Sequence, residues 1–106
     1  MSEDRESELF QALAMNLFHA AWAALGKVPN PLNGKLERDL GAARMAIDAL
    51  SALEVRSRGN RTEAENRLFD RALGDLRLNY LDEVRKGEYA KGDDAPAPPA
   101  GPEASA

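Results

Sequence analysis

Apolar residues recur every three or four positions in three segments of the chain, roughly residues 9–25, 36–53 and 69–84. This spacing is the period of an α-helix that buries one face. Nothing between residues 9 and 86 alternates with the two-residue period of a strand. The stripes comprise Phe10, Leu13, Leu17, Ala21, Ala24 and Leu25 in the first segment, Leu36, Leu40, Ala43, Ile47 and Leu50 in the second, and Phe69, Ala72, Leu73, Leu76, Tyr80 and Val84 in the third. The pattern therefore predicts an all-α fold with three helices.

Glycine and proline separate these segments. Gly26 ends the first, and the segment after it contains two prolines, which the interior of a helix does not accommodate. Gly59 and Asn60 end the second helix, as a C-terminal glycine commonly does. Thr62 and Glu65 have the spacing of a capping box, in which each side chain binds the backbone amide of the other residue. Because short connections make consecutive helices neighbours, we expect an antiparallel, bundle-like body of three helices.

Charge and composition divide the 106 residues into three parts. Residues 1–8 carry four acidic side chains and one basic one, and we assign them to an acidic N-terminal extension. Residues 9–87 form the predicted three-helix domain. Residues 1–8 and 88–106 together carry more negative charge than the whole chain, so the net charge of this domain is positive. Residues 88–106 are rich in Ala, Pro and acidic residues, which have little to bury, so they are predicted to form a disordered tail.

The apolar residues exceed what the interior of three helices of this size can hold. The second helix, for example, has an additional apolar face made of Ala42, Met45, Ala46, Ala49 and Leu53. Contiguous apolar surface that a monomer cannot bury usually marks an interface, and Trp is among the residues most enriched at binding hot spots. Burial in the monomer's own core is the alternative. We predict an interface for self-association or for a protein partner at Met15, Phe18 and Trp22 of the first helix and Leu78 and Leu81 of the third.

An ordered series of short motifs resembles a bacterial family, the domain of unknown function 1844. The motifs are Leu25-Gly26, Pro29-Asn30-Pro31, Gly34, Asp39-Leu40, Ala43-Arg44, Ile47-Asp48-Ala49-Leu50, Gly59-Asn60, Thr62, Glu65, Leu76-Arg77 and Tyr80-Leu81. The resemblance implies a small helical protein without assigned chemistry. It also implies that Arg61 replaces a leucine of relatives, which could pack against the fourth residue of the following helix. That residue is Asn66 here, so we expect no hydrophobic staple at this turn.

Few side chains are suited to catalysis or to metal binding. The chain has no cysteine, which excludes disulfides and thiolate chemistry, and its one histidine, His19, has no His or Cys companion. The sequence shows no nucleophile–base pair, metal-ligand cluster or phosphate-binding loop. We therefore expect no cofactor and no enzymatic activity, and we interpret His19 as a surface or interface residue.

Asp39 falls inside the predicted apolar arc of the second helix, near Ala46 and Leu50 in projection. A carboxylate there costs free energy unless it is paired or hydrogen-bonded. The functional interpretation is a site acid, and the structural one is a salt bridge or a cap for a neighbouring helix or loop. We favour the structural interpretation, and we place Asp39 with Thr62 and Glu65 among the polar residues that hold the fold.

Arginines concentrate around the turn between the second and third helices. A basic cluster of this kind can contact phosphates, and it supports nucleic-acid or ribonucleoprotein association as an alternative function. Acidic residues interleave with the arginines, and Phe69 is the only aromatic residue near enough for base stacking. The predicted phosphate contacts are Arg56, Arg58, Arg61, Arg67 and Arg71.

Residues 9–25 contain no charged side chain, and their 17 positions reach the lower limit for a membrane span. Gln11, Asn16 and His19 interrupt this segment, so we predict no transmembrane segment and prefer a buried or interfacial helix. Peripheral membrane contact through this helix is a second alternative, which the flanking acidic residues oppose on an anionic surface.

The hypothesis that these observations favour is a non-enzymatic helical interaction or scaffold protein. It self-associates, as a homo-oligomer, or binds a protein partner through apolar helix faces. Ten of the 14 basic residues are arginine, alanine is abundant, and the acidic N-terminus does not resemble a signal peptide, so we expect a cytoplasmic bacterial protein.

Overall fold

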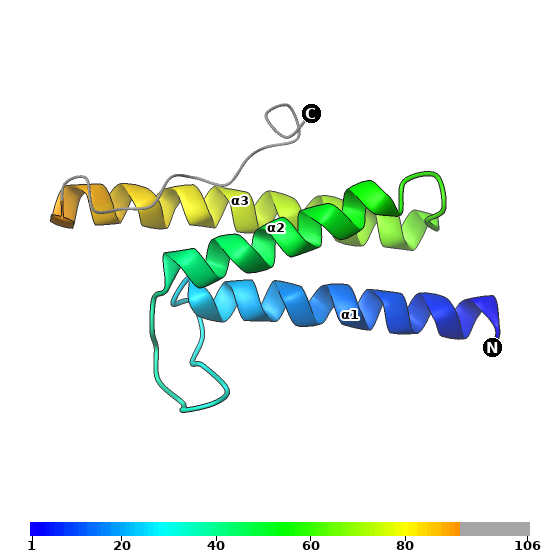
Figure 1. Ribbon diagram of the computed structural model, residues 1–106, viewed down its shortest axis with the longest axis horizontal. Helices are drawn as coiled ribbons and strands as arrows, with labels where there is room; N and C mark the ends of the chain where they lie inside the picture. The colour runs from blue at the N-terminus through cyan, green and yellow to red at the C-terminus, as the bar shows by residue number, and fades with distance from the viewer. Residues whose placement is uncertain (92–106) are drawn as a thin grey trace.

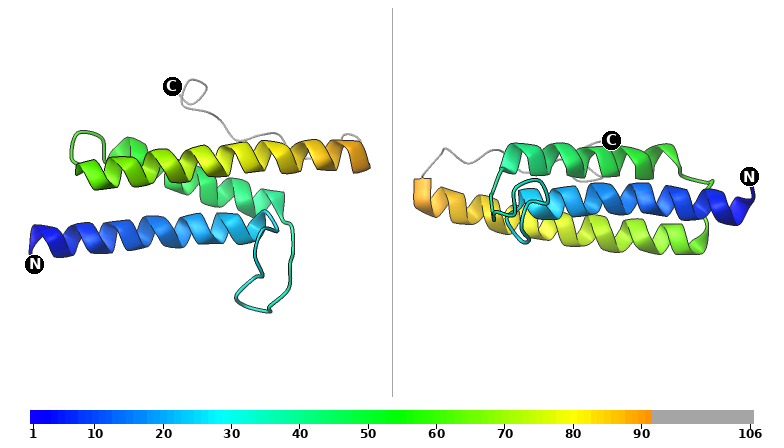
Figure 2. Two further views of the ribbon diagram at one scale, coloured as in Figure 1. Left: turned by 180° about the vertical axis from the view of Figure 1, so that it is seen from behind. Right: turned by 90° about the horizontal axis from the view of Figure 1, so that it is seen from below.

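The computed structural model of the chain describes residues 1–91, with side chains up to Gly87. In this range it contains three helices and no strand: α1 (Glu3–Ala24), α2 (Leu40–Arg56) and α3 (Glu63–Lys91). α1 and α3 run in the same direction, and α2 runs opposite to both (Figure 1). In the right-hand view of Figure 2, α2 and α3 lie on the two sides of α1. The predicted all-α, three-helix fold is confirmed.

Two helices extend beyond the segments that the apolar pattern predicts. α1 begins at Glu3, where Ser2 caps the helix by accepting a hydrogen bond from the Arg5 amide at 3.1 Å. The acidic residues of the predicted N-terminal extension occupy the first turns of α1, where they interact favourably with the helix dipole. α3 continues to Lys91, beyond the predicted domain end at Gly87. The rest of the predicted disordered tail, residues 92–106, lies outside the described residues.

The core lies where the three helices meet. Its largest fully buried side chains come from all three: Leu25 directly after α1, Ile47 and Leu50 on α2, and Phe69, Leu76 and Tyr80 on α3. The stripes of α2 and α3 bury the residues that the helical period selects, with one exception. Leu36 is 66% exposed, because α2 begins only at Leu40 and Leu36 lies in the loop before it.

The buried face of α1 differs from the predicted one. Ala14 and Ala21 are fully buried, whereas Leu13 is 51% exposed, so Leu13 is wrongly assigned to the core. Phe10 and Leu17 are half-buried against the core. The two alanines let the neighbouring helices approach α1 closely, and the leucine next to Ala14 is turned toward solvent.

The turn between α2 and α3 is held by reciprocal polar contacts. Thr62 Oγ1 accepts a hydrogen bond from the Glu65 amide at 3.1 Å, and Glu65 Oε1 accepts one from the Thr62 amide at 2.8 Å. This is the capping-box geometry that the spacing predicts. The other carboxylate oxygen of Glu65 accepts a hydrogen bond from Ser7 Oγ at 2.5 Å, which joins the start of α3 to α1.

Arg61 provides a polar contact in the position of the missing hydrophobic staple. Its Nε donates to Asn66 Oδ1 at 2.7 Å, which joins the residue before the cap to the fourth helical residue. Its NH2 donates to Glu54 Oε2 at 2.9 Å, and its guanidinium lies 5.2 Å from the ring centroid of Phe69. The arginine therefore fixes the α2–α3 turn against the core.

Residues 26–39 form a loop that projects beyond α1 (Figure 1). Gly26 begins it with a φ of 79°, a left-handed conformation that glycine adopts without strain. The loop closes where the Asp39 amide donates to the Ala24 carbonyl at 2.8 Å. Asp39 then caps α2, because its side chain accepts a hydrogen bond from the Ala42 amide at 3.0 Å. The two ends of the loop are thus held together beside α1.

Candidate interaction surface

Glu83 of α3 is a buried carboxylate that holds the loop between α1 and α2 to the bundle. Its Oε2 accepts hydrogen bonds from Lys27 Nζ at 2.8 Å and Lys86 Nζ at 3.0 Å. Its Oε1 accepts one from Arg38 NH1 at 3.2 Å. Burial raises the pKa of Glu83, but the hydrogen bonds from these three cations outweigh it and lower the pKa from 4.5 to about 2. The loop is therefore fastened to α3 at both of its ends.

Two further carboxylates are committed to the fold in the same way. The hydrogen bond from Arg58, with smaller effects of Arg61, lowers the pKa of Glu54 against the opposing effect of burial. The hydrogen bond from Ser7, together with those from Thr62, lowers the pKa of Glu65. Both groups are ionised at neutral pH and already hold hydrogen-bond donors, so they act as structural anchors.

The surface shared by α1 and α2 is apolar and exposed. We define the α1–α2 face as Leu9, Leu13, Asn16 and Ala20 of α1 with Ala42, Met45 and Ala49 of α2. Leu9 and Leu13 are 44% and 51% exposed, and Met45 is 72% exposed. Their helical spacing places them on the same flank as Ala20 and Ala42, which line one hollow between the two helices. The face contains no charged side chain.

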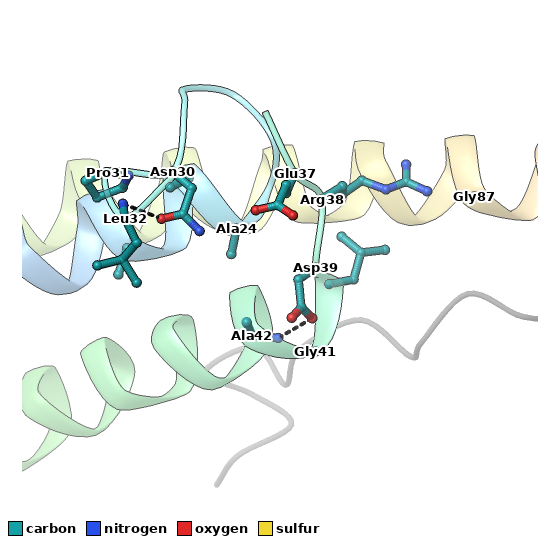
Figure 3. A pocket seen from close by; sticks show the side chains of 13 residues that line it. Ala24, Asn30, Pro31, Leu32, Glu37, Arg38, Asp39, Gly41, Ala42 and Gly87 are labelled. Carbon is teal, nitrogen blue, oxygen red and sulfur yellow. Dashed lines mark hydrogen bonds between the residues drawn. The ribbon is translucent and has the colours of Figure 1, made fainter. Parts of the chain in front are cut away.

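A hollow of about 730 Å³ lies at one end of the α1–α2 face. Ala20, Ala23 and Ala24 form its α1 side, and α2 contributes its first turn. The loop, including the charged residues Glu37, Arg38 and Asp39, forms the remaining wall together with Gly87 of α3. Figure 3 shows Leu32 of the loop beside α1, and Arg38 extending toward α3. The α1 side of the hollow consists of small side chains. Near the start of α1 the same flank carries Leu9 and Leu13, whereas near its end it carries alanines.

The structure does not bring the five predicted interface residues into one surface. Met15 and Phe18 are half-buried and line a second hollow with α3 residues that include Leu68 and Ala72. The Phe18 and Trp22 rings stack with centroids 5.5 Å apart, and both pack against the core. These three α1 residues mainly fill the space between α1 and α3.

Leu78 and Leu81 lie elsewhere on α3. Leu81 is one turn beyond Arg77, whose NH2 donates to Ser51 of α2 at 3.1 Å, so Leu81 lies on the α2 side of the helix. Leu78 is 69% exposed. A joint interface of these two leucines with the α1 residues that face α3 is therefore not formed within one copy of the chain.

The predicted phosphate contacts are separated as well. Arg58 donates two hydrogen bonds to Glu54, and Arg61 is 10% exposed and held by the same carboxylate. The guanidinium of Arg61 thus has hydrogen-bond partners within the fold, and the phosphate contact at this residue stays a prediction. Arg67 and Arg71 are exposed, but they line the α1–α3 hollow together with two aspartates, whereas Arg56 lies at the end of α2.

Asp39 is exposed and lies in front of α2, so its predicted place in an apolar arc is wrong. His19 is exposed on α1, with its ring 5.6 Å from that of Phe18. Among residues 1–91, no three His, Asp or Glu side chains group in a way that could hold a metal ion. None of the helices in this part of the chain combines the length and apolarity that crossing a membrane requires.

Reasoning from the sequence missed two features of this surface. Glu83 follows Tyr80 by three residues and therefore lies on the core stripe of α3, a signal that could have identified it as a buried carboxylate. The exposure of Leu9 and Leu13 had no comparable signal, because α1 has no charged residue after Glu8 that would mark its outer side.

Comparison with known proteins adds one finding. A family model described as Domain of unknown function (DUF1844) matches residues 7–82, which include most of α1, all of α2 and most of α3. No curated protein and no solved structure matches the chain.

Proposed function

The chain belongs to the family Domain of unknown function (DUF1844), whose description assigns no activity, and we propose a function from the geometry of its surface. We propose that it is a non-enzymatic helical interaction protein of the bacterial cytoplasm. It self-associates through the α1–α2 face and presents its remaining surfaces as a scaffold.

The observation that carries this proposal is the exposed, uncharged α1–α2 face. From Leu9 to Leu25 the chain has no charged residue, although α1 is a surface helix with Leu9 and Leu13 exposed to solvent. A surface helix normally carries charged residues on its outer side. An apolar strip that extends over two neighbouring helices is typical of an interface.

The buried acidic side chains support the absence of catalysis in this proposal. A general acid or base at neutral pH needs a pKa near 7 and access to a substrate. The pKa values of Glu54, Glu65 and Glu83 are all lowered, and each carboxylate already binds donors of the chain itself. These groups stabilise the fold and are not poised for proton transfer.

Size-exclusion chromatography with light scattering tests the proposal. We expect the wild-type chain to have the mass of an oligomer at micromolar concentration. Leu13→Glu places a charge at the centre of the α1–α2 face in every copy, and each carboxylate would be desolvated in the assembly. Leu78→Glu is the matched control, because Leu78 is at least as exposed but lies on α3, outside this face.

We expect Leu13→Glu to weaken self-association about 100-fold, since each copy contributes a loss of at least about 1.4 kcal/mol, and Leu78→Glu to leave the mass unchanged. Circular dichroism of both variants checks that the helices remain. A monomeric wild-type chain at 100 µM, or equal masses for the two variants, would refute self-association through this face.

A further inference from the structure

The proposed self-association can be given a specific geometry. We infer that two copies pack α1 against α1 in antiparallel orientation, about a two-fold axis at Asn16. Leu9 and Leu13 of each copy enter the alanine-floored hollow of the other copy. This inference rests on the proposed function, and it names a second copy of the chain as the occupant of the hollow.

The first argument is the spacing along α1 of four exposed residues and the half-buried Ala23. Leu9, Leu13, Asn16, Ala20 and Ala23 are separated by four, three, four and three positions. This alternation is the repeat of a coiled-coil seam, in which each side chain enters a gap between side chains of a facing helix. α2 and α3 bury other flanks of α1, so the leucine half of this seam is exposed, whereas its alanine half borders the hollow shared with the first turn of α2. Its complement is another helix with the same repeat.

The second argument is the unequal size of the two halves of the seam. Its first half carries leucines, which project from the surface, and its second half carries alanines, which floor the hollow of about 730 Å³. A parallel pair would place leucine against leucine and hollow against hollow. An antiparallel pair places the leucines of each copy in the hollow of the other. The surface is therefore self-complementary in one orientation, as a closed two-fold dimer requires.

The position of the axis follows from the register. Leu9 precedes Asn16 by seven residues and Ala23 follows it by seven, so both lie about 10.5 Å from Asn16 along the helix. An axis at Asn16 thus brings Leu9 opposite Ala23, and it brings Leu13 opposite the turn that contains Ala20. Asn16 is exposed and has both an amide donor and a carbonyl acceptor, so it can bind its own copy across the axis.

The acidic first turn of α1 disfavours a parallel pair. This turn contains Glu3, Asp4 and Glu6, and the opposite end of the seam adjoins the loop, in which Lys35, Glu37 and Asp39 are all exposed. Antiparallel packing sets the acidic turn of each copy against the loop of the other, where Leu32 is also exposed. Parallel packing would set two acidic turns side by side, with repulsion between them.

The size of the surface is of the order that a specific pair requires. The segment from Leu9 to Leu25 is about 24 Å long, and two helices side by side are about 20 Å wide, so the α1–α2 face covers about 480 Å² in projection. Side-chain relief and the loop increase the accessible area of this face. The total approaches the roughly 800 Å² that each partner contributes to an interface of standard size.

Oxidative cross-linking of single-cysteine variants tests the geometry, because the chain has no cysteine of its own. Helices packed about 8–10 Å apart bring facing Cα atoms to about 3.4–5.4 Å at the axis, which is close to disulfide range. Two copies of position 13 would be about 9 Å apart along the helices, beyond that range. Leu78→Cys on α3 measures the background from random collision.

We expect Asn16→Cys to form disulfide-linked dimers at least tenfold faster than Leu78→Cys. Leu13→Cys alone should react at the background rate, and Leu13→Cys mixed with Ala20→Cys should link across the two copies. The inference is wrong if Leu13→Cys cross-links with itself as fast as Asn16→Cys, which is the result for a parallel pair. It is also wrong if no position on the seam exceeds the background while light scattering shows a dimer, because another face is then used. A monomeric mass would overturn the proposed function itself.

An exchange of side chains provides a second test that needs no oxidation. Leu13→Ala removes a projecting side chain, and Ala20→Leu obstructs the hollow, so each change alone should weaken the dimer at least tenfold. The double variant Leu13→Ala/Ala20→Leu exchanges the two halves and should recover most of the wild-type affinity. Additive losses in the double variant would contradict the antiparallel register.

Discussion

The carboxylate of Glu83 allows a quantitative test of what holds the α1–α2 loop in place. In Glu83→Gln the side chain keeps its shape but loses its charge, so Lys27 and Arg38 lose the anion that they share. A carboxyl whose pKa is about 2 in the folded chain and 4.5 in the unfolded one contributes about 3 kcal/mol. The side chains of Lys27 and Arg38 are 22% and 32% exposed, so water solvates both cations in Glu83→Gln and offsets part of the lost free energy of unfolding. We expect a loss of about 2 kcal/mol.

The assay is urea unfolding followed by the fluorescence of Trp22, the single tryptophan. The protein concentration is held constant, since self-association would otherwise contribute to the apparent stability. For a typical slope of the unfolding free energy against urea concentration, a loss of about 2 kcal/mol lowers the midpoint of unfolding by about 1–2 M urea. Asp82→Asn is the matched control: Asp82 is the neighbouring residue, its side chain is 54% exposed, and it forms an ion pair with Lys86. We expect its loss to remain below about 0.5 kcal/mol.

The pH dependence gives an independent measurement of the same interaction. Because the pKa of Glu83 is lowered on folding, its contribution is complete above pH 4.5 and is lost as the pH falls toward about 2. The difference in unfolding free energy between wild type and Glu83→Gln should therefore shrink over this range. Glu54 and Glu65 titrate in both proteins, so their effects cancel in the difference. Equal stability of Glu83→Gln and Asp82→Asn at pH 7, or a difference that does not change with pH, would refute the reasoning.

Two further predictions concern the cap of α2 and the core. Asp39→Ala should cost about 1 kcal/mol in urea unfolding, whereas Asp39→Asn should cost little because asparagine caps a helix as well as aspartate does; equal losses would assign the effect to charge. Leu76→Ala should cost about 2–5 kcal/mol by leaving a cavity at a fully buried position. The exposed Leu78→Ala should stay within about 0.5 kcal/mol, and similar losses for the two would place the core elsewhere.

The contrast between Asp39 and Glu83 shows where sequence patterns succeed and where they fail. Both carboxylates fall on an apolar stripe in helical projection, but the projection holds only for residues that are within the helix. Asp39 precedes α2, so its apparent burial is an artefact of extending the helix across the loop to Leu36. Glu83 lies well inside α3, and its burial is real. The partners of Glu83 could not be derived from the pattern, because Lys27 and Arg38 come from a loop without a repeat.

The same contrast explains why the core of α2 and α3 followed from the sequence while the buried face of α1 did not. In α2 and α3, charged residues mark the outer side, so the stripes through Ile47 and Leu76 are unambiguous. α1 has no charged residue after Glu8, and its apolar positions surround the axis, so the period alone cannot choose between Leu13 and Ala14. That ambiguity is itself informative. A helix that buries one flank in its own core and still needs no charge on the opposite flank is suited to burial on both sides. In the proposed dimer, a second α1 provides the second burial.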